Sequence, residues 1–328
     1  MRVVFMGSPH FALPTLQKLI ESEHEIVAVY TQPDRPVGRG RKVSSPPVKS
    51  LALEHGLPVR QPPSISEPDV VEQLRKLRPD VGVIAAFGQI LKQPVLDAPR
   101  LGVLNVHASL LPRWRGAAPV PAAILAGDTE TGATIMLVRR RLDSGPILDA
   151  VRIPVGAGDT AGTLTDKIGE AGARLLVQVL PRYASGSITP SEQDESLATF
   201  APSLKKGDGL IDWSRNDAET VSRKVRAYNP WPVAFSYLDN EPLRILESVT
   251  LQHHFDDEPG TIFALTGVGE PNLYGAGFGV VCAKGEVGIV AVQAAGGKRM
   301  LAADYLRGHR DITGKRLRPT RHDDASSG

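Results

Sequence analysis

Residues 1–30, MRVVFMGSPHFALPTLQKLIESEHEIVAVY, contain three short patterns that together indicate one fold class. Val3–Gly7 is an apolar run that ends in glycine, which is typical of a buried strand followed by a turn. Phe11–Ile20 repeats its apolar residues at helical spacing, and Glu25–Tyr30 is a second strand-like run. A strand, a helix and a strand in this order predict a βαβ unit with parallel strands.

The same alternation continues through the first half of the chain. It predicts a Rossmann-like α/β domain, in which a doubly wound, mainly parallel sheet carries helices on both faces. A later strand and a long amphipathic helix close the domain. The further expected strands are 58–61, 81–87, 101–107 and 133–138, and the further expected helices are 47–55, 67–77 and 160–183.

The composition changes after residue 189, which we take as the end of this domain. Residues 190–206 are rich in Ser, Thr, Pro and charged residues, so we expect a linker. Beyond it, a helix-like segment at 216–228 and several short strand-like runs predict a small OB-like β-barrel domain over residues 207–314. Residues 315–328 are poor in apolar side chains and are expected to form a disordered tail.

Composition excludes several classes of protein. The longest apolar run, residues 81–88, is far shorter than the roughly 18 residues of a membrane-spanning helix, and residues 1–7 do not resemble a signal peptide. The single cysteine, Cys282, rules out an intramolecular disulfide or a multi-cysteine metal site and fits a reducing compartment. We therefore expect a cytoplasmic protein with no membrane partner. The net charge of +2 is too small to indicate a nucleic-acid partner by itself.

Polar residues interrupt the apolar strand expected at 101–107. Asn105 and His107 are two residues apart, so strand geometry places both on one face at the carboxyl end, where open α/β sheets bind ligands. From spacing alone, a structural role for both residues, with His107 in the core and Asn105 in a turn, explains this pair as well as a functional site does. Asp143 lies in Leu142–Gly145, where an isolated aspartate is more often a turn or cap residue. Spacing cannot pair it with His107.

Together these residues resemble the folate-dependent formyltransferases, which transfer a formyl group from 10-formyltetrahydrofolate to an amine. The resemblance rests first on Asn105-x-His107, Ser109-Leu-Leu-Pro112 and Asp143. Five further motifs narrow it to members that act on methionine carried by initiator tRNA, and it covers roughly residues 2–310. These motifs are Gly7–Ala12, Thr31–Gly40, Arg113–Pro119, Ile211–Ser214 and Asn229–Pro232.

The resemblance implies three catalytic residues, Asn105, His107 and Asp143, and 10-formyltetrahydrofolate as the co-substrate, without a metal. The Asn105 amide suits stabilisation of the oxyanion that forms when the amine attacks the formyl carbon. His107 can donate a hydrogen bond or carry a proton, and Asp143 can orient that imidazole or take the amine's proton through a water. The resemblance also implies folate binding by the loop of Ser109, Leu110, Leu111 and Pro112.

A basic segment follows the second expected strand. Taken alone, the four cations at 35–42 indicate a solvated loop. The resemblance implies instead that this loop inserts at the acceptor end of initiator methionyl-tRNA, where its cations meet phosphates or unpaired bases. The residues are Arg35, Arg39, Arg41 and Lys42. The domain at 207–314 is expected to share in tRNA binding, and the protein is expected to be a monomer.

Other functions explain these motifs less well than formyl transfer does. Gly7–Ala12 lacks the G-x-G-x-x-G pattern of a dinucleotide-dependent oxidoreductase, and an RNA-binding module leaves Asn105 and His107 unexplained. A formyltransferase acting on a ribonucleotide amine or an amino-sugar nucleotide stays open as the alternative, although Asn229–Pro232 in a second β domain argues against it. The chain departs from the family pattern at His10, Pro121, Arg139 and Arg141, and Arg141 stands where the family usually has glycine.

Overall fold

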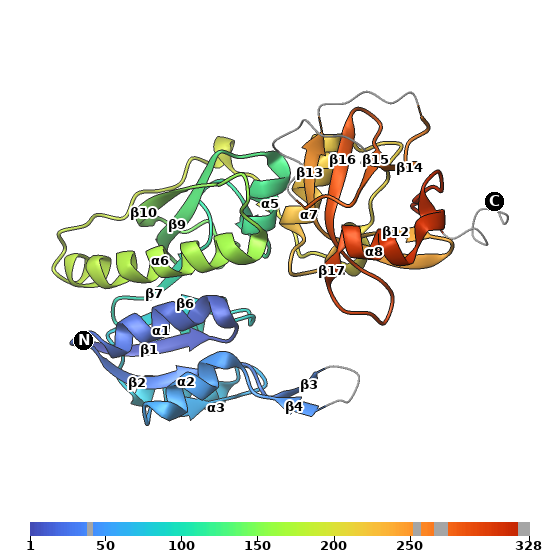
Figure 1. The fold of residues 1–328 in the computed structure, drawn as a ribbon. Coiled ribbons are helices and arrows are strands. Elements are labelled where there is room, and N and C mark those ends of the chain that lie inside the picture. The colour runs from blue at the N-terminus through green and yellow to red at the C-terminus, as the bar shows by residue number, and fades with distance from the viewer. Residues whose placement is uncertain (38–41, 252–256, 266–274, 321–328) are drawn as a thin grey trace. The chain divides into compact units, whose positions relative to one another are not determined.

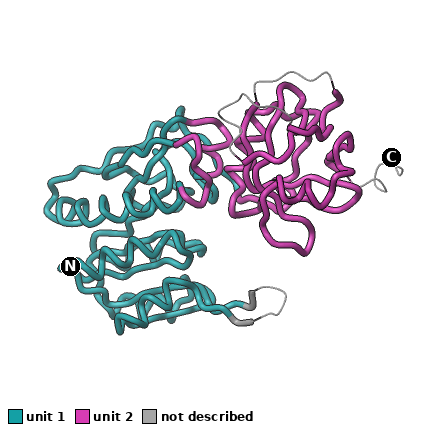
Figure 2. The backbone as a smooth tube through the Cα atoms, viewed as in Figure 1, with its two compact units in different colours: residues 1–120, 129–155, 164–202 teal, residues 121–128, 156–163, 203–328 magenta. Residues whose placement is uncertain are grey.

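The computed structural model describes residues 1–37, 42–251, 257–265 and 275–320, which form two compact units (Figure 2). The first unit consists of residues 1–120, 129–155 and 164–202. The second consists of residues 121–128, 156–163 and the chain from 203 onward. Two short segments before residue 203 therefore belong to the second unit. The prediction of two successive domains did not include them.

The first unit is built on a mainly parallel sheet, as the sequence predicts. In the described part of the chain the sheet has seven strands in the order β10-β9-β7-β6-β1-β2-β5 (Figure 1). The parallel strands are β1 (Arg2–Gly7), β2 (Glu25–Tyr30), β5 (Val59–Arg60), β6 (Val81–Ala85) and β7 (Val103–His107). The antiparallel edge is formed by β9 (Glu130–Leu137) and β10 (Ile147–Pro154). The sequence did not indicate β10, because its exposed residues Ala150 and Pro154 are not polar and leave no regular alternation of apolar and polar side chains.

Helices cover both faces of this sheet and enclose two apolar cores. One core receives buried side chains from α1 (Leu13–Ile20), α2 (Pro47–Glu54) and α6 (Ala161–Ala184). The opposite core receives them from α3 (Pro68–Lys76) and α4 (Gln93–Leu96). In α3, Val71 and Leu74 are three residues apart and both face the sheet, because residues at this spacing share one side of a helix. No helix among the described residues is long and apolar enough to cross a membrane.

The second unit carries a curled antiparallel sheet in the order β12-β13-β16-β15-β14, with β17 on β16. Its strands are β12 (Ala234–Leu238), β13 (Glu241–Leu251), β14 (Ile262–Ala264), β15 (Phe278–Val281), β16 (Glu286–Gln293) and β17 (Met300–Leu301). Asp239 and Asn240 both have positive φ, which a two-residue hairpin between β12 and β13 requires. The helices of this unit are α5 (Pro119–Ala126), which begins two residues before the division, α7 (Ala218–Ala227) and α8 (Ala302–Gly308).

Residues 315–318 are ordered, contrary to the tail expected from residue 315. Lys315 O accepts a hydrogen bond from Ile262 N, whereas Arg318 exchanges two backbone hydrogen bonds of 2.9 Å with Tyr237. The segment therefore pairs with β14 on one side and β12 on the other, and it buries the Leu317 side chain. Residues 321–328 of the expected tail lie outside the described residues.

Residues 190–202 also differ from the expected linker, because they pack into the first unit. β11 (Phe200–Ala201) pairs in parallel with β8 (Arg115–Gly116), and Gln193 is 8% exposed. The segment also contains the short 3-10 helix η2 (Glu195–Leu197). Its polar composition resembles that of a surface loop, but its polar groups are used in hydrogen bonds with the site described below.

Trp213 offers a test of the second unit's core. Its side chain is 1% exposed, and Nε1 donates a 2.9 Å hydrogen bond to Ser236 Oγ. We expect Trp213→Ala to lower the free energy of unfolding by about 3–5 kcal/mol, because the change leaves a cavity and removes the hydrogen bond to Ser236 Oγ. Denaturant unfolding followed by circular dichroism measures this. Trp231→Ala is the matched control because Trp231 is 55% exposed, and equal stability losses in the two variants would contradict the prediction.

Candidate active site

Asn105 and His107 occupy the carboxyl-terminal half of β7. Leu104 and Val106 face the core that α1 and α6 cover, whereas Val103 faces the opposite core. Because side chains alternate along a strand, Asn105 and His107 lie on the same face as Val103. Asn105 pairs with Ile84 of β6 and Met136 of β9, so its backbone is held from both sides.

The His107 ring is buried, at 6% exposed, and both of its nitrogens have oxygen neighbours. Nε2 lies 3.0 Å from Trp114 O, and since a carbonyl oxygen only accepts, this nitrogen carries a proton. Nδ1 lies 3.8 Å from Asp143 Oδ2. The structure thus brings together the histidine and the aspartate, which sequence spacing could not pair.

Asp143 is held by its side chain and by its main chain. Gly116 N donates a 2.8 Å hydrogen bond to Asp143 Oδ2, and Gln193 Nε2 donates a 2.8 Å hydrogen bond to Asp143 O. The residue has φ of 45°, in the left-handed region that costs an L-residue roughly 1–2 kcal/mol. The surrounding hydrogen bonds must therefore stabilise a backbone conformation that the residue does not favour by itself.

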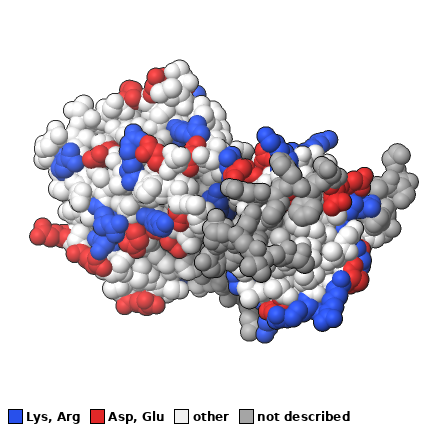
Figure 3. Space-filling view, turned by 45° about the horizontal axis from the view of Figure 1, so that its top comes forward, with Lys and Arg blue, Asp and Glu red and all other residues white. Residues whose placement is uncertain are grey.

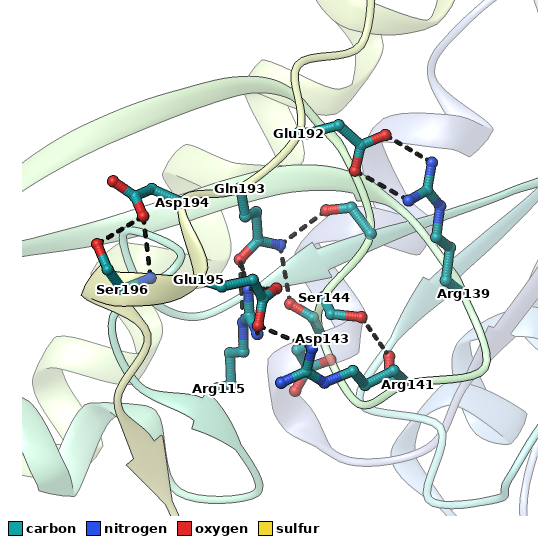
Figure 4. Close-up of polar contacts among 11 residues, drawn as sticks. Arg115, Arg139, Arg141, Asp143, Ser144, Glu192, Gln193, Asp194, Glu195 and Ser196 are labelled. Atoms are coloured by element: carbon teal, nitrogen blue, oxygen red, sulfur yellow. Dashed lines mark hydrogen bonds and ion pairs between the residues drawn. The ribbon is translucent and has the colours of Figure 1, made fainter.

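Gln193 and Glu195 are the site neighbours that sequence reasoning missed, since both lie in the expected linker. Both contact Arg115, which is completely buried (Figure 4). The hydrogen bond from Arg115, together with the charges of Arg115 and Arg141, lowers the pKa of the Glu195 carboxyl. No sequence signal marks a glutamine and a glutamate in a polar segment as partners of a buried arginine.

The two unusual arginines of the adjacent loop form ion pairs with the same segment. Arg139 Nη2 lies 2.7 Å from Glu192 Oε1, and Arg141 Nη1 lies 2.8 Å from Glu195 Oε2 (Figure 4). The residue with positive φ in this loop is Asp143, and Arg141 does not share that conformation. A glycine's freedom is therefore not required at position 141, and the departure from the family pattern is compatible with the observed loop.

The loop expected to bind folate is tightly held from within. Ser109 Oγ donates to Arg113 O at 2.6 Å, while Thr134 Oγ1 donates to Ser109 O and accepts from Leu111 N. Ser109 and Leu111 are buried, whereas Leu110 and Pro112 are half-buried. The loop has a defined shape, and its contact with folate stays a prediction.

A pocket of about 510 Å³ lies beside the loop that carries Asp143. Leu96 and Val138 are its apolar lining residues. The rest of the lining is polar or charged and consists of Gln93, Arg139, Arg140, Arg141, Ser144, Glu192, Gln193 and Glu195. Asn105, His107 and Asp143 are not among the lining residues, and this mainly charged wall differs from the mainly apolar wall of most small-molecule sites. No group of three or more potential metal ligands was found among the described residues.

The basic loop is described only in part. Arg35 begins β3 (Arg35–Val37), is exposed and donates to Gln32 Oε1, and Lys42 begins β4 (Lys42–Ser44), which pairs with β3. Arg39 and Arg41 lie outside the described residues. Elsewhere, basic and acidic side chains are interspersed over much of the face in Figure 3.

Two family models match most of the chain. The model for the formyl transferase domain matches residues 1–180, and the model for the formyl transferase C-terminal domain matches residues 203–310. The chain is 49% identical to the methionyl-tRNA formyltransferase of Methylococcus capsulatus over 317 residues, covering 97% of this chain and 99% of that one. It is 46% identical to the enzyme of the same name from Magnetococcus marinus, covering 96% and 98%.

Solved structures share the fold at much lower identity. HypX from Aquifex aeolicus, in complex with tetrahydrofolic acid, gives a TM-score of 0.63 at 18% identity, covering 93% of this chain and 47% of that one. WlaRD, a sugar 3N-formyl transferase, gives 0.62 at 15% identity, covering 90% and 97%. The sequence identity to the two methionyl-tRNA formyltransferases is much higher than the identity to these structures, and it extends over nearly the whole chain. The chain therefore belongs to the formyltransferase family, in the group of the methionyl-tRNA formyltransferases.

Proposed function

We propose that this chain transfers the formyl group of 10-formyltetrahydrofolate to the α-amino group of methionine on initiator methionyl-tRNA, for translation initiation. Membership of the methionyl-tRNA formyltransferase group supports the reaction and both substrates. The observation that carries the site is the 3.8 Å approach of His107 Nδ1 to Asp143 Oδ2 at the end of β7.

The chemistry divides between the three polar side chains. The uncharged amine attacks the formyl carbon, so that a C–N bond forms and the carbonyl oxygen becomes an oxyanion. The Asn105 amide stabilises this oxyanion as a hydrogen-bond donor that is already in place. The bond from the formyl carbon to N10 of the folate then breaks, which regenerates the carbonyl.

The proton that the amine loses passes to His107 and Asp143 as a pair. Because Nε2 of His107 already carries a proton towards Trp114 O, Nδ1 is the nitrogen that can accept another. The Asp143 carboxylate stabilises the resulting imidazolium, and the pair returns the proton to N10 of the leaving tetrahydrofolate. The atoms balance without any additional reactant.

The remaining assignments are part of the proposal and rest on the resemblance to the family. We assign folate contact to the loop of Ser109, Leu110, Leu111 and Pro112, and tRNA contact to the loop of Arg35, Arg39, Arg41 and Lys42. The first unit, which includes residues 190–202, is the catalytic domain, and the second unit, which includes residues 315–318, is an OB-like domain that also contacts tRNA. The protein acts as a cytoplasmic monomer, which light scattering of the purified chain tests.

Transfer itself is the first test. The chain is incubated with 10-formyltetrahydrofolate and methionine-charged initiator tRNA, and in parallel with uncharged tRNA, a ribonucleotide amine and an amino-sugar nucleotide. We expect mass spectrometry to find a formyl group on the charged tRNA alone. Formylation of one of the small amines instead would replace the tRNA assignment with the alternative acceptor.

Variants of the proposed catalytic residues test the mechanism. We expect Asn105→Ala to lower kcat by about 10²–10³-fold, because one donor to the oxyanion is lost. Asp143→Asn removes the negative charge beside His107 and should lower kcat at least about tenfold. Rapid-quench formyl transfer measures both. Asp149→Asn, an aspartate in the exposed edge strand β10, is the control, and near-wild-type rates for the first two variants would refute the assignment.

The basic loop predicts a salt-dependent effect on tRNA binding alone. Replacing Arg35, Arg39, Arg41 and Lys42 with glutamine should weaken tRNA binding and reduce its salt slope by up to about 3, because up to four phosphate contacts are lost. Filter binding at several salt concentrations measures this, and folate affinity should not change. The control replaces four cations elsewhere in the first unit, Lys76, Arg152, Arg174 and Arg182, and equal losses in both variants would contradict the assignment.

A further inference from the structure

Arg115 is a completely buried arginine, which makes its partners energetically important. A buried guanidinium must be paired and hydrogen bonded, because desolvating it costs several kcal/mol. Nε and Nη2 donate to Gln193 Oε1 at 3.0 and 2.8 Å, and Nη1 and Nη2 donate to the Glu195 carboxylate at 3.1 and 2.9 Å. Both partners come from the segment that follows α6.

The guanidinium determines which way the Gln193 amide points. Arginine only donates, so the amide atom that faces Arg115 must be the oxygen, and the NH₂ group must face the other way. On that side Nε2 donates to Asp143 O at 2.8 Å and to Gly145 O at 2.7 Å (Figure 4). Gln193 therefore connects the buried cation to the main chain of the loop that carries Asp143.

Gly116, the residue after Arg115, holds the side chain of Asp143. Gly116 N donates to Asp143 Oδ2, the same oxygen that lies 3.8 Å from His107 Nδ1. A methyl group at Gly116 would come within 2.5 Å of Ala201 O, so β8 and β11 approach closely at this donor, and Ala117 N donates a 2.9 Å hydrogen bond to the same oxygen. The side chain of Asp143 is thus held by Gly116, and its strained main chain is held by Gln193.

We propose that Gln193, oriented by Arg115, is a positioning residue that holds the Asp143 carboxylate at its working distance from His107. The inference rests on the proposed function, because it gives Gln193 a role in the same reaction. Without the two hydrogen bonds from Gln193, the left-handed conformation of Asp143 loses support and the carboxylate moves. A displacement of about 1 Å in a catalytic site can cost on the order of 10²-fold in rate.

Gln193→Ala tests the role through the separation of kcat from KM. We expect kcat to fall by about 10–100-fold, while KM for folate and for tRNA changes less than about threefold, because the loss falls on the chemical step. Glu192→Gln is the matched control: Glu192 is the adjacent residue, is exposed, and pairs with Arg139 rather than with Arg115. The kcat and KM of Glu192→Gln should stay within about twofold of the wild-type values.

A double-mutant cycle distinguishes positioning from general damage. In an Asp143→Asn background, Gln193→Ala should lower kcat by less than about threefold. If Gln193 acts only by positioning the Asp143 carboxylate, its removal has little effect once that carboxylate is absent. An equal loss in both backgrounds would overturn the proposal. So would a Gln193→Ala enzyme with wild-type kcat, or one with a change confined to KM.

Hydrogen exchange tests the proposal by a measurement other than activity. Hydrogen exchange at the Gly116 amide should accelerate in Gln193→Ala and not in Glu192→Gln, because this amide donates to Asp143. A wild-type chain without transfer activity would refute the proposed function, whereas unchanged exchange would refute the role of Gln193. If Gln193→Ala fails to fold, Gln193→Glu keeps an acceptor for Arg115 and takes its place. Failure of both variants to fold would assign Gln193 a structural role and overturn the proposal.

Discussion

The burial of Arg115 is the constraint on which the candidate site depends. A guanidinium with no access to water needs acceptors from the protein, and here the acceptors are Gln193 and Glu195. This requirement draws a segment nearly eighty residues further along the chain back against β8. The amide of Gln193 then supports the loop of Asp143 through the main-chain oxygens of Asp143 and Gly145.

The parallel sheet supplies the other half of the site. β7 lies between β6 and β9, so its backbone is hydrogen bonded on both edges, and its apolar residues are divided between the two cores. Two polar residues in such a strand are costly unless their polar atoms find partners. His107 has found Trp114 O and Asp143, whereas Asn105 is half-buried at the carboxyl end of the strand, where parallel sheets commonly bind ligands.

Long-range polar contacts explain where sequence reasoning failed. The expected linker at 190–206 and the expected tail at 315–328 were both assigned from polar composition. Gln193 is nevertheless buried against Arg115, and residues 315–318 pair with β12 and β14. Composition measures how little apolar area a segment can bury, but it does not count the hydrogen bonds that distant parts of the fold offer to that segment. Hydrophobic patterning likewise missed β10, because its exposed residues Ala150 and Pro154 obscure the alternation of apolar and polar side chains.

The sequence by itself determined the mainly parallel α/β sheet, the presence of a second β-rich unit and the placement of Asn105 and His107 on one strand. These depend on hydrophobic periodicity and on spacing within single elements, which are local properties. Only the tertiary structure decided that Asp143 approaches His107, that Gln193 and Gly116 hold it there, and that Arg141 can stand in place of a glycine. Each of these depends on contacts between residues far apart in the chain, and the energies that select such contacts, burial and hydrogen-bond pairing, exist only once the chain has folded.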